Sequence, residues 1–169
     1  EMLLLSYTPL GSSGGSSARL NFSDLASLVS LELVGCGLRA LPLLPPLMDT
    51  LDVSQNALTA LDLTGLPRLL AVRAADNALT GADVTDCAPR LVNLDLSGNR
   101  ALNERSLRGL DTAHAARRLS ELVLSRCSFA AAPHALANAS LLSRVEMSEN
   151  LLSAVPVMHG GALTVLLLH

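Results

Sequence analysis

The chain has 169 residues and a formal net charge of −3, from 15 acidic residues and 12 basic residues that are all arginine. Half of the residues are hydrophobic and 2% are aromatic, which supplies ample aliphatic material for one long core and little for stacking against nucleic-acid bases. No apolar stretch reaches membrane-spanning length, and residues 1–5 lack the basic start of a secretory leader.

A partial copy of the pattern LxxLxLxxNxL begins the chain, with Leu3, Leu5, Thr8 and Leu10 at its fourth, sixth, ninth and eleventh positions. Residues 11–17 read GSSGGSS where a return segment is expected, and this composition predicts a flexible loop. Six full copies then occupy residues 28–161. A last partial copy is predicted in residues 162–169, with Ala162, Val165 and Leu167 at its first, fourth and sixth positions.

The six full copies share apolar residues at the first, fourth, sixth and eleventh positions and asparagine or cysteine at the ninth. They are Leu28, Leu31, Leu33, Cys36, Leu38; Met48, Leu51, Val53, Asn56, Leu58; Leu69, Val72, Ala74, Asn77, Leu79; Leu91, Leu94, Leu96, Asn99, Leu102, with one extra residue; Leu119, Leu122, Leu124, Cys127, Phe129; and Leu142, Val145, Met147, Asn150, Leu152. Six copies in one register indicate a repeat solenoid.

This pattern resembles that of the leucine-rich repeat family over nearly all of the chain. The resemblance implies a single α/β solenoid domain over residues 1–169, with a curved parallel sheet on its concave side and short turns, 3-10 or helical segments on its convex side. Period-two alternation directs the fourth and sixth positions inward. The ninth-position side chains are predicted to form a structural ladder of hydrogen bonds to turn backbone, comprising Cys36, Asn56, Asn77, Asn99, Cys127 and Asn150.

The return segments differ in length. Equivalent fourth-position residues are 20 to 23 residues apart, except that Leu94 and Leu122 are separated by 28. In this long repeat, Asn103 has the character of a helix N-cap, and Leu107, Leu110 and Ala113 have helical spacing, which predicts a convex helix. The long repeat is similar to the ribonuclease-inhibitor type.

Both ends of the chain fall within a repeat, and neither end shows a polar cap. Because terminal repeats of a free solenoid need a polar outer surface, this favours a fragment of a longer array, with an irregular cap as the alternative.

The cysteines bear on the compartment. Cys36 and Cys127 lie four repeats apart, so at about 4.8 Å per strand they are on the order of 19 Å apart, beyond disulfide reach. Together with Cys87 they predict three reduced thiols and an intracellular, cytoplasmic setting. Two glycosylation sequons, at Asn21 and Asn138, leave an extracellular or cell-surface location open.

The sequence offers no catalytic, cofactor or metal site. His114, His134, His159 and His169 are scattered without partners at metal-ligand spacing, and no catalytic motif is present. We therefore expect a non-catalytic protein with no cofactor, and the sequence gives no indication of its oligomeric state.

The concave side is predicted to carry excess acid. In the six full repeats its outward positions hold eight acidic residues, Glu32, Asp49, Asp52, Asp76, Asp95, Glu121, Glu146 and Glu149, against Arg73, Arg126 and Arg144, a net charge of −5. The resemblance implies that a protein partner docks there, on the central row Glu32, Asp52, Arg73, Asp95, Val123 and Glu146, and the charge favours a basic partner segment. The alternative is that these acids only keep an exposed sheet soluble.

Other partners and functions remain as alternatives. Arginines of opposite sign cluster in the long repeat, namely Arg100, Arg105, Arg108, Arg117 and Arg118, where an acidic protein is an alternative partner and nucleic acid is disfavoured by the absence of lysine and interleaved aromatics. The stretch 41–56 is similar to repeats of bacterial effector ubiquitin ligases, so a substrate-recognition domain of a larger enzyme is one alternative. A cell-surface receptor ectodomain is another.

Overall fold

The computed structural model describes residues 1–10, 20–110, 117–155 and 162–168. The predicted loop at 11–17, together with Ala113, His114, His159 and His169, lies outside the described residues.

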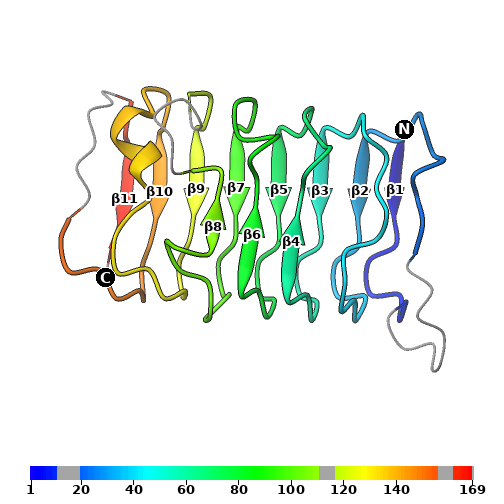
Figure 1. The fold of residues 1–169 in the computed structure, drawn as a ribbon, viewed down its shortest axis with the longest axis horizontal. Helices are drawn as coiled ribbons and strands as arrows, with labels where there is room; N and C mark the ends of the chain where they lie inside the picture. The colour runs from blue at the N-terminus through cyan, green and yellow to red at the C-terminus, as the bar shows by residue number, and fades with distance from the viewer. Residues whose placement is uncertain (11–19, 111–116, 156–161, 169) are drawn as a thin grey trace.

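Eight short parallel strands lie side by side along the length of the molecule and form one sheet (Figure 1). They are β1 (Met2–Leu4), β2 (Ser30–Glu32), β3 (Thr50–Asp52), β5 (Ala71–Arg73), β7 (Asn93–Asp95), β9 (Glu121–Val123), β10 (Arg144–Glu146) and β11 (Val165–Leu167). The middle residue of each strand from β2 to β10 is buried, whereas its two neighbours point outward. We keep the name concave face for the outward side of this sheet.

The last strand departs from its predicted register by one residue. Val145 pairs with Leu166, so Leu166 occupies the fourth position that the sequence assigned to Val165. This register moves Leu163 and Leu168 to the first and sixth positions, and both leucines pack against the core. Leu163 and Leu168 are half-buried in this register, whereas Leu166, on the last strand of the sheet, remains 36% exposed.

The convex side carries a second, smaller parallel sheet. Its strands are β4 (Ala60–Asp62), β6 (Gly81–Asp83) and β8 (Leu107–Arg108), and the 3-10 helix η1 (His134–Asn138) occupies the equivalent place one repeat later. Figure 1 shows the three strands crossing in front of the larger sheet. The chain therefore closes three of these repeats with extended backbone, at β4, β6 and β8, and the next with a 3-10 helix.

The helix predicted from Asn103 is wrong for the residues that the structure describes. Asn103 does cap a turn, because its Oδ1 accepts the N–H groups of Arg105 at 3.0 Å and Ser106 at 3.2 Å. The chain then enters β8, where Ser106 and Arg108 accept backbone hydrogen bonds from the neighbouring β6 repeat. Pairing with an existing strand edge outweighs the local helical pattern.

The core is a stack of aliphatic side chains between the two sides. Residues at the first, fourth and sixth positions of the six full repeats are buried, and Phe129 is the largest of the fully buried side chains. Each buried leucine contributes roughly 1.5–3 kcal/mol, and each repeat gains this only by covering its neighbour. The stacking holds successive strands at a fixed register and so sets the positions of the concave side chains.

Candidate concave binding face

The central side chains of the sheet form one row across the strands. Strand pairing aligns Glu32 with Asp52, Asp52 with Arg73, Arg73 with Asp95, Asp95 with Val123, and Val123 with Glu146. Arg73 is exposed and the other five are half-buried. The six residues that the sequence nominated for partner binding therefore lie together on adjacent strands, which we call the central row.

Ninth-position side chains tie the turn after each strand to the preceding repeat. In Asn56, Asn77, Asn99 and Asn150, Oδ1 accepts an N–H group of the preceding repeat at 2.9–3.0 Å, while Nδ2 donates to three backbone carbonyls. Asn99 is fully buried. These bonds connect neighbouring repeats next to the central row.

Cysteine at the same position makes only the donor half of this network. The Cys36 thiol donates to the Leu5 carbonyl at 3.1 Å, and the Cys127 thiol donates to the Leu96 carbonyl at 3.4 Å. The N–H groups that an asparagine there would serve already have partners, because Leu10 N donates to Thr8 O and Leu102 N donates to Asn99 O. The extra residue in the Asn99 repeat makes the second of these turns possible.

All three cysteines are free, as predicted, and the structure also shows that all three are buried. Burial raises the pKa of the Cys87 thiol to about 12 and that of Cys127 to about 11. Both thiols are protonated at neutral pH, so neither is suited to nucleophilic or metal-binding chemistry.

Ion pairs neutralise much of the acid on the concave face. Arg126 binds Asp76 at 3.1 Å, and Arg144 contacts both Glu121, at 3.2 Å, and Glu146. Arg68, from the return segment, lies 3.6 Å from Asp49. Among the outward positions of the six full repeats, the acids without a cationic partner in the described residues are Glu32, Asp52, Asp95 and Glu149. The unbalanced charge is therefore concentrated on the N-terminal part of the central row.

Two of these carboxylates are fixed by the residue that follows each strand. Asp52 Oδ1 accepts the Ser54 N–H group at 3.0 Å, and Asp95 Oδ1 accepts both the N–H group of Ser97, at 2.9 Å, and its hydroxyl, at 2.6 Å. Arg73, between them on β5, has no ion pair with any described residue. A free guanidinium thus stands between two carboxylates that are turned toward their own serines.

A small pocket of about 90 Å³ lies beside Arg73. Its lining residues are Val72, Arg73, Asn93, Leu94, Asp95, Glu121 and Val123. Asn93 Nδ2 donates to Glu121 Oε2 at 2.8 Å, which leaves the Asn93 carbonyl oxygen and the second Asp95 oxygen as acceptors. This volume is about that of three water molecules, enough for the end of one side chain.

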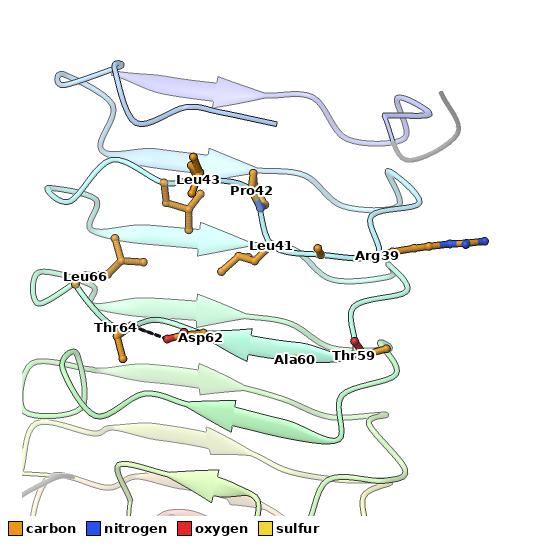
Figure 2. Close-up of a pocket in the computed structure, with 12 residues that line it drawn as sticks. Arg39, Leu41, Pro42, Leu43, Thr59, Ala60, Asp62, Thr64 and Leu66 are labelled. Carbon is orange, nitrogen blue, oxygen red and sulfur yellow. Dashed lines mark hydrogen bonds between the residues drawn. The ribbon is translucent and has the colours of Figure 1, made fainter. Parts of the chain in front are cut away.

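A second pocket, of about 340 Å³, lies on the convex side (Figure 2). It separates β4 from the segment 41–44, where Leu43 pairs with residues on its far side, through Leu20 O at 2.9 Å and Phe22 N at 2.8 Å. Pro42 has no N–H group to continue the convex sheet toward β4. The lining contains Arg39, Asp62 and Thr64, and the Thr64 hydroxyl donates to Asp62 Oδ1 at 2.7 Å.

Sequence reasoning missed a row of left-handed residues at the eighth position. Besides Gly35 and Gly98, the residues with positive φ there are Tyr7, Gln55, Asp76, Arg126 and Glu149. Side chains bridge across the glycines, because the Tyr7 hydroxyl donates to Gln55 Oε1 at 3.1 Å and Arg126 reaches Asp76. The two eighth-position glycines were the available sequence signal for this backbone conformation.

The remaining candidates do not form a second site. His134 lies at the start of η1, and the five arginines of the long repeat are exposed on its surface. Within the described part of the chain, no three side chains are grouped to bind a metal ion. The helical residues there also include no segment long and apolar enough to cross a membrane.

Comparisons with known proteins bear on the fold. No protein-family model and no curated protein matches the chain. Among solved structures, it is similar to the functional domain of InlJ from Listeria monocytogenes, which includes a cysteine ladder, with a TM-score of 0.75 and 22% identity, covering 88% of this chain and 31% of that one. It also aligns with a leucine-rich repeat protein of Leptospira interrogans at a TM-score of 0.41 and 18% identity, covering 78% of this chain and 46% of that one. The chain therefore spans about a third of the InlJ structure that it matches.

Proposed function

Because the chain has the leucine-rich repeat fold, we propose that it is a non-catalytic protein-interaction module whose concave, net acidic face binds a basic segment of a protein partner. The observation that carries the proposal is the concentration of unpaired carboxylates on the central row, at Glu32, Asp52 and Asp95. Exposed charges of one sign accelerate the encounter with an oppositely charged partner and help to set its orientation.

The proposed contact surface is the central row, Glu32, Asp52, Arg73, Asp95, Val123 and Glu146. Its width, six strands at about 4.8 Å each, suits a partner segment that lies across the strands. Val123 offers an apolar contact, and Glu146 contributes less charge because Arg144 already pairs with it. The first three acids therefore supply most of the attraction.

The test is a charge reversal with a matched control. Asp95→Arg should slow association with the native partner, recovered from the source organism, by roughly tenfold or more at low ionic strength. Asp83→Arg is the control, because Asp83 makes the same bonds on the convex side, accepting the N–H group of Thr85 at 3.0 Å and its hydroxyl at 2.6 Å. Both variants change net charge equally and lose equivalent turn bonds.

Surface plasmon resonance at several salt concentrations separates the outcomes. The proposal predicts a steep salt dependence for the wild type, slow association for Asp95→Arg, and near-normal association for Asp83→Arg. If Asp95→Arg binds normally while reversal of Arg100 and Arg105 abolishes binding, the concave model fails and the arginine patch takes its place.

We also propose an intracellular, reducing setting, which the three free, buried thiols support. Asn21 provides the opposing test, since this sequon residue is exposed and would be open to glycosylation in a secretory pathway. Mass spectrometry of the native protein should find Asn21 unmodified, and a glycan there would overturn the proposed location.

A further inference from the structure

The unpaired charges of the central row occupy four consecutive strands. They are Glu32 on β2, Asp52 on β3, Arg73 on β5 and Asp95 on β7, and none of them forms an ion pair with a described residue. Among the outward positions of the six full repeats, every other charge is paired with a described residue except Glu149, which lies in the turn after β10. Along the solenoid the unpaired signs read negative, negative, positive, negative.

Apolar side chains flank this charged stretch at both ends of the row. Leu4 on β1 aligns with Glu32 and is 54% exposed, and half-buried Val123 on β9 aligns with Asp95. The row from β1 to β9 therefore presents one apolar residue, four charged residues and another apolar residue. A binding segment that complements all six positions must carry the opposite charges in the same order.

Arg73 makes a uniformly basic segment a poor fit. Its guanidinium group has five N–H donors, and the carboxylates on both sides are held by Ser54 and Ser97. A lysine or arginine placed over Arg73 would be repelled, and an apolar residue would desolvate the guanidinium group without a partner. The segment therefore needs a carboxylate at that one position.

The strand spacing decides between an extended and a helical segment. Adjacent strands lie about 4.8 Å apart, so the six positions span about 24 Å. On one face of an α-helix, the residues i−7, i−4, i, i+3, i+7 and i+10 are spaced on average about 5.1 Å along the axis and together span about 25.5 Å. Alternate residues of an extended chain are about 6.7 Å apart, and six of them span about 33 Å. The helix stays in step with the row, whereas the extended chain does not.

Resting on the function proposed above, we propose that the partner element is an amphipathic α-helix that lies along the central row. The helix carries basic residues at i−4, i and i+7, which meet Glu32, Asp52 and Asp95, and an acidic residue at i+3, which meets Arg73. Apolar residues at i−7 and i+10 contact Leu4 and Val123. Arg73 sets the register of the helix on the row, because it is the position that pairs with the acidic residue at i+3.

Two synthetic peptides of equal composition test this order. Both are alanine-rich helices of about 20 residues with leucine at i−7 and i+10 and lysine at i−4 and i+7. The matched peptide has lysine at i and glutamate at i+3, and the control peptide exchanges these two residues. At low ionic strength we expect the matched peptide to bind about tenfold more tightly by fluorescence anisotropy, and high salt should remove the difference.

Exchanging the corresponding charges on the protein should invert the preference. The double variant Asp52→Arg with Arg73→Asp keeps the net charge and should favour the control peptide. Arg73→Ala, which leaves the Asp52 turn intact, provides a second measurement if the double variant does not fold, and it should reduce the preference about threefold. Circular dichroism melts establish that each variant is folded.

The outcomes separate this inference from the proposed function. Equal binding of both peptides to the wild type, or an unchanged preference in Arg73→Ala, would overturn the helical register. So would equally tight binding of a matched peptide that a central proline prevents from forming a helix. If the native partner nevertheless associates more slowly with Asp95→Arg than with Asp83→Arg, the proposed acidic interaction face is supported and only the helical partner element is refuted.

Discussion

Replacing Asn99 with cysteine tests what the ninth position requires. The Asn99 side chain is fully buried, and its Oδ1 accepts the Leu79 N–H group at 3.0 Å. Its Nδ2 donates to the carbonyls of Ala74 at 3.0 Å, Leu96 at 2.8 Å and Ser97 at 3.3 Å. A cysteine at this position keeps a weak donor, as the Cys127 thiol does toward Leu96 O, but cannot replace the amide acceptor.

The expected loss follows from one buried N–H group. Asn99→Cys leaves Leu79 N without an acceptor, which costs about 1–3 kcal/mol. For a domain of this size the melting temperature should fall by about 2–4 °C per kcal/mol. Asn99→Ala also removes the donors to three carbonyls, so its loss should be roughly twice as large. In contrast, Cys127→Asn should change stability by less than about 1 kcal/mol, because Leu102 N is already paired with Asn99 O.

Urea denaturation followed by circular dichroism measures these differences, with equal m-values required so that the same cooperative unit is compared. The reasoning would be refuted if Asn99→Cys were as stable as the wild type. It would also be refuted if Cys127→Asn gained as much stability as Asn99→Cys lost.

Four further predictions concern backbone strain and the thiols. Gly98→Ala should cost about 1–3 kcal/mol in urea denaturation, because φ is +74° and a Cβ would lie 2.2 Å from Asp76 Oδ1. Glu149→Gly should raise the free energy of unfolding by about 1 kcal/mol, since Glu149 has φ +55° and no ion pair with a described residue. An unchanged urea midpoint would contradict this. The thiols should react with maleimide only on unfolding, with or without reductant. Because folding raises the pKa of Cys87 from 9.0 to about 12, stability should be complete below pH 9 and fall as pH rises toward 12, and a flat profile in that window would contradict the thiol contribution.

The strand register and the inward leucines were predictable from the sequence because both follow from short-range periodicity. A residue such as Leu31 or Leu94 marks the inward side of its strand, and every full repeat restates the same register. The prediction for the last strand was wrong by one residue because 162–168 offers two apolar alignments, and their spacing is the same.

The convex strands and the ion pairs were not predictable for a different reason. The helical spacing of Leu107 and Leu110 is a local signal, whereas β8 depends on the edge of β6, about 25 residues earlier in the chain. Likewise, counting charges gave eight acids against three arginines, but a count does not say that Arg144 contacts two glutamates or that Arg73 contacts none. Pairing depends on side-chain direction, which spacing does not determine.

The hydrogen bonds from Ser54 to Asp52 and from Ser97 to Asp95 explain why the Arg73 guanidinium group has no ion pair with a described residue. Aspartate followed two residues later by serine or threonine also ends the convex strands, where Asp62 and Asp83 accept hydrogen bonds from Thr64 and Thr85. Because this hydrogen-bonded turn occurs on both sides of the solenoid, its role is to end the strand and not to bind a partner. On the concave face these bonds affect Arg73, which lies between Asp52 and Asp95. Without the serine bonds, the two carboxylates would be free to form ion pairs with Arg73. Loss of the hydroxyl bond in Ser97→Ala should therefore release part of the hold on Asp95, allow an Arg73 to Asp95 ion pair, and weaken partner binding without touching a partner-contacting residue.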